Sequence, residues 1–172
     1  MTATRIFTAL LISSACFLAS PAQAQHHGHA NHPADHQANP RAIVKEDTSR
    51  ADFTTTLKNL KEQLATDGWN LVAEIDLGGR LAKKGVNIPG GLVLLELTSG
   101  KYSVPLLKKD ETRYVSAFMP CTVSVYGMSD GRVIVSRINA SMMASMMEPQ
   151  LADAMSKSAA ALEETLARAL AK

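Results

Sequence analysis

Residues 117–126, Ala-Phe-Met-Pro-Cys-Thr-Val-Ser-Val-Tyr, constrain the fold more than any other part of the chain. Cys121, Val123 and Val125 alternate with polar residues, which is the two-residue period of a strand with one buried face. Pro120 suits the start of such a strand because it has no N–H to donate to a ladder. An Asp-Gly turn at 130–131 precedes a second alternating segment at 133–137. Together they predict a β-hairpin against which the rest of one small domain is built.

The segments around this hairpin predict helices and further strands. Apolar residues recur at helical spacing over about 50–67, where Ser49 is placed to cap the first turn and Gly68 to end the helix. Leu71, Ala73 and Ile75 are expected on one face of a strand at 69–77. We further expect strands at 41–47 and 92–97, short helices at 78–86 and after Asn139, and a final helix at about 150–171, with 98–112 unassigned.

This order of elements predicts the α+β class. The expected architecture is a single compact domain over 41–172, with a mainly antiparallel sheet packed against two or three helices.

Residues 1–24 have the features of a secretory signal peptide. Arg5 precedes an apolar run at 6–18, and Ala22-Gln23-Ala24 is a small-residue cleavage pattern. We therefore expect a mature chain that begins at Gln25 and is periplasmic or secreted. No second apolar run is long enough to cross a membrane, so no membrane association is expected after cleavage.

Charge and cysteine content argue against a nucleic-acid-binding protein and against a fold held by an internal disulfide. The formal net charge is +2, and no basic stripe interleaved with aromatic residues is present, so nucleic acid is not an expected partner. The chain has two cysteines, and cleavage would remove Cys16 and leave Cys121 alone. An internal disulfide is then excluded, and the fold must depend on its apolar core.

Three short stretches resemble the family named domain of unknown function 302, over about residues 41–148. They are Asp67-Gly68-Trp69, Glu74-Ile75-Asp76, and Pro120-Cys121 leading into Val123-Ser124-Val125-Tyr126. The resemblance implies a compact α+β domain, a homodimer, and no established biochemical activity. Family members commonly carry Cys-Asn-Pro after the third strand, but residues 97–102 here contain no cysteine. If the family uses two thiols together, this chain cannot, and only the Cys121 position is retained.

Residues 25–40 are expected to form a disordered tail, because they contain almost no large apolar side chains. Five imidazoles within eleven residues make this tail a candidate ligand set for Cu or Ni, and less so for Zn. The candidate metal ligands are His26, His27, His29, His32 and His36, together with the amine of Gln25. The alternative is a solvated linker whose histidines bind nothing.

Sulfur side chains provide a second candidate site. Thioethers at helical spacing after Asn139 suit Cu(I), and a free thiol suits redox or nucleophilic chemistry. The residues concerned are Cys121, Met119, Met142, Met143, Met146 and Met147. We favour the simpler interpretation that Cys121 is a small buried hydrophobe and that the methionines fill the core or a dimer contact.

Three functions follow from these features. The first is a non-enzymatic exported binding protein with a metal-chelating tail. The second is a redox protein or enzyme that acts through Cys121, although the predicted domain contains no histidine to serve as a base. The third is a structural module in which methionines mediate dimerisation. No residue is assigned a catalytic role, and no phosphate-binding glycine motif is present.

The sharpest expectation concerns the mature N-terminus. The amine of Gln25, two backbone amides and the imidazole of His27 offer a square-planar nitrogen set for Cu(II) or Ni(II), which Zn does not favour. We expect freshly processed protein to bind one Cu(II) with a square-planar absorption spectrum. Inserting one Ala before His27 should abolish that spectrum and leave weaker histidine binding. Cyclisation of Gln25 would remove the site. An unchanged spectrum after the insertion would contradict this assignment.

Overall fold

The computed structural model describes residues 43–172. The predicted signal peptide and the His-rich tail lie outside these residues. In chain order the elements are β1 (Val44–Ser49), α2 (Phe53–Thr66), β2 (Asn70–Asp76), α3 (Leu77–Ala82), β3 (Leu92–Thr98), α4 (Gly100–Leu107), the 3-10 helix η1 (Asp110–Phe118), β4 (Cys121–Gly127), β5 (Val133–Ile138), α5 (Ala140–Ala144) and α6 (Pro149–Leu170).

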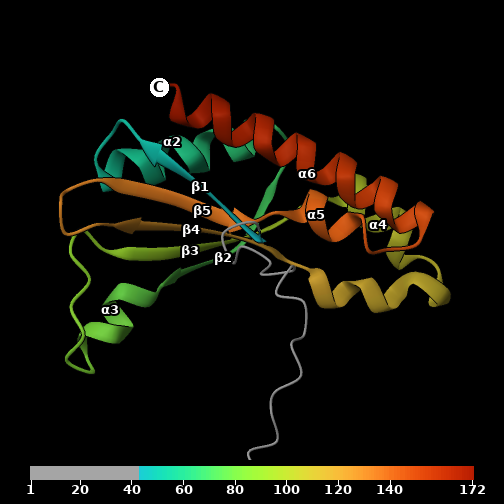
Figure 1. The fold of residues 1–172 in the computed structure, drawn as a ribbon, viewed down its shortest axis with the longest axis horizontal. Coiled ribbons are helices and arrows are strands. Elements are labelled where there is room, and N and C mark those ends of the chain that lie inside the picture. The colour runs from blue at the N-terminus through green and yellow to red at the C-terminus, as the bar shows by residue number, and fades with distance from the viewer. Residues whose placement is uncertain (1–42) are drawn as a thin grey trace, which may run out of the picture. The chain divides into compact units, whose positions relative to one another are not determined.

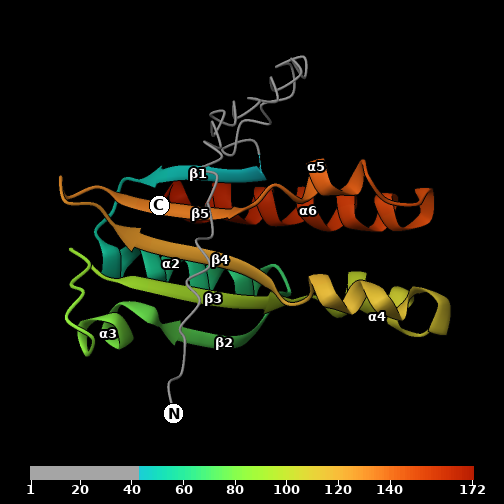
Figure 2. The same ribbon diagram turned by 60° about the horizontal axis from the view of Figure 1, so that its bottom comes forward.

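The strands of the described region form one antiparallel sheet in the order β1-β5-β4-β3-β2. The sheet lies in front in Figure 2, with α2 and α6 behind it. Figure 1 shows these two helices side by side over the same face, where they pack against each other. The predicted α+β class, with its antiparallel sheet and long helices, is confirmed.

The hydrophobic core fills the layer between the sheet and the two long helices. Val123, Val125 and Val135 are fully buried, and they point to the same side as Leu95 and Leu97 of β3. The opposing helices contribute Leu60, Leu64, Leu162, Leu166 and Ala169. Burying one large aliphatic side chain stabilises a fold by roughly 1.5–3 kcal/mol, so this layer is the main stabilising element.

The hairpin of β4 and β5 is observed, with Val125 opposite Val135 and Gly131 in the left-handed conformation at a φ of 88°. The sequence places a strand within residues 117–126, with Pro120 suited to its start, and β4 begins at Cys121. Helix η1 continues to Phe118, and Pro120 cannot donate a ladder hydrogen bond. The strand therefore begins one residue after the proline.

Two local expectations were wrong. Asp52, not Ser49, caps α2 by accepting a hydrogen bond from the N–H of Thr55 at 2.9 Å. Ser49 instead ends β1 opposite Val133, because strand pairing takes precedence over helix capping at this position.

In β2, the register shifts between Leu71 and Ala73. Leu71 lies opposite Leu97, whose face is covered by the helices, whereas Ala73 and Ile75 pair with residues on the other face. The single shared face that strict alternation predicts is therefore broken by a bulge.

The structure also defines residues 98–112, the methionine segment and the start of α6. The unassigned region 98–112 contains α4 and the start of η1. The predicted methionine helix ends at Ala144, so Met146 and Met147 lie beyond it in a turn. Pro149 is the first residue of α6, as its missing N–H predicts.

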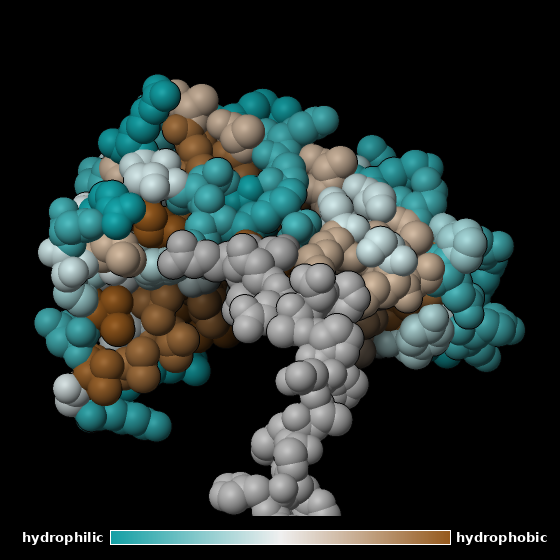
Figure 3. Space-filling model, viewed as in Figure 1, coloured by the Kyte–Doolittle hydropathy of each residue, from teal (hydrophilic) through white to brown (hydrophobic). Residues whose placement is uncertain are grey.

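On the outer surface, hydrophobic side chains gather over α3 and the adjoining end of the sheet (Figure 3). The predicted homodimer would need such a surface, and it stays a prediction.

An ion-pair cluster joins β1, β5 and α6. The guanidinium of Arg137, only 8% exposed, binds Asp47 and makes two hydrogen bonds to Glu163, one from Nε at 3.1 Å. Burial would raise the pKa of Glu163, but hydrogen bonds and charge from Arg137, with Lys45 3.5 Å away, lower it below the ordinary 4.5. Removing one partner of such a pair leaves a buried charge uncompensated.

This cluster predicts a pH-dependent contribution to stability. The pKa of Glu163 is depressed in the folded state, so its contribution is fully present above pH 4.5 and is lost as the pH falls through the folded-state value. Glu163→Gln should lower the free energy of unfolding by about 1–3 kcal/mol at pH 7. In urea unfolding, this difference from the native protein should shrink below pH 4.5.

The matched control is Glu164→Gln, on the next residue of α6. The carboxylate of Glu164 is 72% exposed and lies 3.8 Å from Arg168, so its replacement should change the stability little. A difference for Glu163→Gln that is independent of pH would contradict the account.

Candidate functional site

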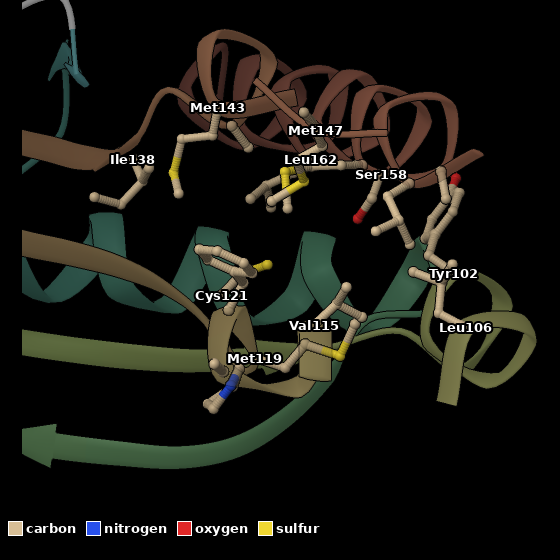
Figure 4. Close-up of a pocket in the computed structure, with 18 of the residues that line it drawn as sticks. Tyr102, Leu106, Val115, Met119, Cys121, Ile138, Met143, Met147, Ser158 and Leu162 are labelled. Atoms are coloured by element: carbon tan, nitrogen blue, oxygen red, sulfur yellow. The ribbon is translucent and has the colours of Figure 1, made fainter. Parts of the chain in front are cut away.

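A cavity of about 330 Å³ lies where the helical layer extends beyond the sheet. One wall is formed by the end of η1 and the start of β4, and the opposite wall by α5 and α6 (Figure 4). Tyr102 and Leu106 of α4 close one end, and Ile138 of β5 lies toward the other. Apolar side chains make up most of this lining. The cavity is therefore an unfilled apolar space that adjoins the hydrophobic core.

Sulfur atoms are concentrated in this lining. The residues that contribute them are Met119, Cys121, Met143, Met147 and Met155. The cavity thus brings together four of the six sulfur residues that the sequence singles out. Met142 and Met146 are not among them, because they are 38% and 78% exposed on the surface.

Met155 was not predicted as part of a sulfur site. It belongs to the apolar stripe of α6, and a stripe alone does not distinguish a residue packed in the core from one that faces a cavity. The sequence feature that could have indicated Met155 is the helical face that it shares with Leu151 and Leu162, and both of these residues line the cavity.

Cys121 is the first residue of β4 and lies opposite Leu97 of β3, on the face that also carries Val123 and Val125. It is half-buried and free, and its sulfur points into the cavity (Figure 4). Burial raises the pKa of the Cys121 thiol above its ordinary value of 9.0, and the negative charge of Glu96 raises it further. The group is therefore a neutral thiol near pH 7, which is a poor nucleophile.

Two polar groups of the cavity wall, on Arg137 and Thr122, are already engaged. Of the described residues that line the cavity, Arg137 carries the one charge, and it is paired with Asp47 and Glu163. The hydroxyl of Thr122 donates to the carboxylate of Glu96, 3.1 Å from each oxygen. The ring of Tyr102 stacks on Trp69 with centroids 6.2 Å apart. The site thus offers an apolar, sulfur-rich surface rather than a charged one.

Within residues 43–172, no three His, Cys, Asp or Glu side chains are grouped to hold a metal ion. The histidines and Gln25, predicted as tail ligands, lie outside the described residues, so their grouping stays a prediction. No helix in the described part of the chain is long and apolar enough to cross a membrane.

The environment of Cys121 predicts its reactivity. In alkylation with iodoacetamide, the midpoint of the rate–pH profile should lie above 9.0, because burial and Glu96 both disfavour the thiolate. Glu96→Gln removes the nearby charge and should lower the midpoint, raising the rate at pH 8 by about twofold. Glu74→Gln, on exposed β2, is the control. Reaction as fast as that of a free cysteine peptide would contradict the assignment.

Comparison with known proteins agrees with this fold. No curated protein matches the chain. Among solved structures, one match is titled "Crystal structure of uncharacterized conserved protein DUF302 from Bacillus stearothermophilus". The TM-score is 0.66 at 22% sequence identity, covering 74% of this chain and 98% of the other. At this identity the match supports the shared fold alone.

The family comparison covers most of the chain and includes every strand of the sheet except the first residue of β1. A family model described as "Domain of unknown function DUF302" matches residues 45–172. The expected resemblance is confirmed, and it extends through α6, beyond the 41–148 range that the short motifs indicated. The chain belongs to the DUF302 family.

Proposed function

We propose that the domain is a non-enzymatic binding protein whose cavity holds a small, uncharged, apolar molecule. The observation that carries this proposal is the cavity of about 330 Å³ at the end of the core, lined mainly by aliphatic and thioether side chains. Ligand pockets typically range from roughly 300 to 1,000 Å³ and are mostly apolar with a few polar groups. This cavity lies at the lower end of that range, which suits a ligand of modest size.

The cavity wall favours binding over catalysis. A nucleophilic cysteine needs a base or a positive charge that lowers its pKa, whereas burial and then the charge of Glu96 raise the pKa of Cys121. All five histidines of the chain lie at positions 26–36, before the domain. These features support binding over the alternative of redox chemistry or catalysis through Cys121.

The charges of the wall favour a neutral ligand. Arg137 already binds two carboxylates, so it has no unmatched charge with which to attract an anion. Placing a charged group in an apolar cavity without a partner is costly. Methionines adapt to varied shapes through their three rotatable bonds, which suits a pocket that accepts related apolar molecules.

A second function is proposed for the tail. We infer that the mature protein is exported and that residues 25–40 chelate Cu(II) or Ni(II). The spacing of the five histidines supports this, and the N-terminal insertion described above tests it. The domain and the tail would then bind different ligands independently.

The cavity proposal is tested with N-phenyl-1-naphthylamine, a neutral dye that fluoresces in apolar surroundings. Native protein should bind it saturably at one dye per chain. Ala154→Phe places a ring in the cavity from α6 and should weaken dye binding by about tenfold or more.

Ala160→Phe, on the exposed side of the same helix, is the matched control and should leave binding unchanged. Urea unfolding of both variants verifies that each is folded. Equal dye binding by the two variants would contradict the proposal.

A further inference from the structure

Two walls of the cavity present soft sulfur ligands to each other. Met143 of α5 and Met147, in the turn after it, reach in from the helical side, and the thiol of Cys121 points in from β4 (Figure 4). These residues come from segments more than twenty positions apart, so only the fold brings them together. Met119 and Met155 add two further thioethers to the same lining.

Only two of the four methionines in this segment line the cavity. Four methionines occur within residues 142–147, and the chain directs Met143 and Met147 into the cavity while Met142 and Met146 are exposed. Core filling alone accounts for two half-buried thioethers. It does not require that both face a free thiol across an unfilled space.

We propose that the cavity binds one Cu(I) ion through Cys121, Met143 and Met147. Thioethers are soft ligands that suit Cu(I), whereas a Zn site is typically built from several thiolates and imidazoles. The described residues hold no group of three His, Cys, Asp or Glu side chains, so this wall offers one thiol with thioethers and not a typical Zn ligand set. The methionine side chains are flexible enough to converge on one ion.

The charge balance favours a monovalent ion. On binding, the S–H bond of Cys121 breaks, a sulfur–copper bond forms, and the proton passes to water, with no change in oxidation state. The thiolate and Cu(I) together are neutral, so no net charge enters the apolar cavity. A divalent ion would leave a positive charge there without a partner, since the carboxylates of Asp47 and Glu163 are held by Arg137.

The test uses the full mature chain with all five tail histidines replaced by Asn, so that the tail does not compete. Cu(I) is added anaerobically with ascorbate in the presence of bicinchoninate, whose coloured copper complex reports the affinity by competition. We expect one Cu(I) per chain, X-ray absorption showing sulfur neighbours only, and no displacement by excess Zn(II). Displacement by Zn(II), or nitrogen and oxygen neighbours, would overturn the proposal.

Paired variants locate the site. The double variant Met143→Leu/Met147→Leu conserves volume approximately and should weaken Cu(I) binding by about tenfold or more. The control Met142→Leu/Met146→Leu changes two exposed methionines of the same segment and should bind as the parent does. Equal affinities of the two double variants would overturn the assignment.

Cys121→Ser replaces the soft thiolate with a hydroxyl and should lower the affinity further. If Cys121→Ser does not fold, the two methionine variants still decide the question. No organic ligand enters these measurements, so they stand apart from the dye experiment. Cu(I) binding without dye binding would support this site while contradicting the apolar-ligand proposal.

Discussion

Burial of one face of the sheet beneath α2 and α6 is the constraint on which the described structure depends. The sole cysteine of the described residues is free, so no disulfide supports this part of the chain. Stability must come from apolar area, and the strands supply it through the alternation that buries Leu95, Val123 and Val135. The two long helices are needed because an antiparallel sheet with one apolar face must cover that face. The cavity forms where this cover meets shorter elements.

The place of Cys121 shows how the cavity arises from the core. The alternation that buries Val123 and Val125 continues to Cys121, but the strand begins there, directly after Pro120. Beyond that point the backbone turns into η1, while α6 continues past the end of the sheet (Figure 1). The apolar face of the strand therefore ends against a space that α4, α5 and η1 enclose without filling.

Electrostatics determine the chemistry that this space can support. Arg137 lies at its wall, yet its charge is neutralised by Asp47 and Glu163, so the ion pair joins β1, β5 and α6 rather than attracting a ligand. Burial, and then the negative charge of Glu96 on the neighbouring strand, raise the pKa of the Cys121 thiol. A protonated thiol among thioethers is suited to apolar molecules or to a soft cation, and poorly suited to nucleophilic attack.

Sequence patterns alone determined the hairpin, the long helices and the α+β class, because alternation, helical periodicity and Asp-Gly turn chemistry are local properties. Local patterns did not separate Asp52 from Ser49 as the cap, because Ser49 is taken up by pairing with Val133 of β5. Nor did they reveal the bulge after Leu71, which depends on the pairing of β2 with β3. They also could not separate Met143 from Met142, because neighbouring residues on a short helix differ only in the direction that tertiary packing assigns them. Tertiary structure alone decided which sulfurs share a cavity with Cys121, because the residues that enclose it come from six separate elements and the turns between them.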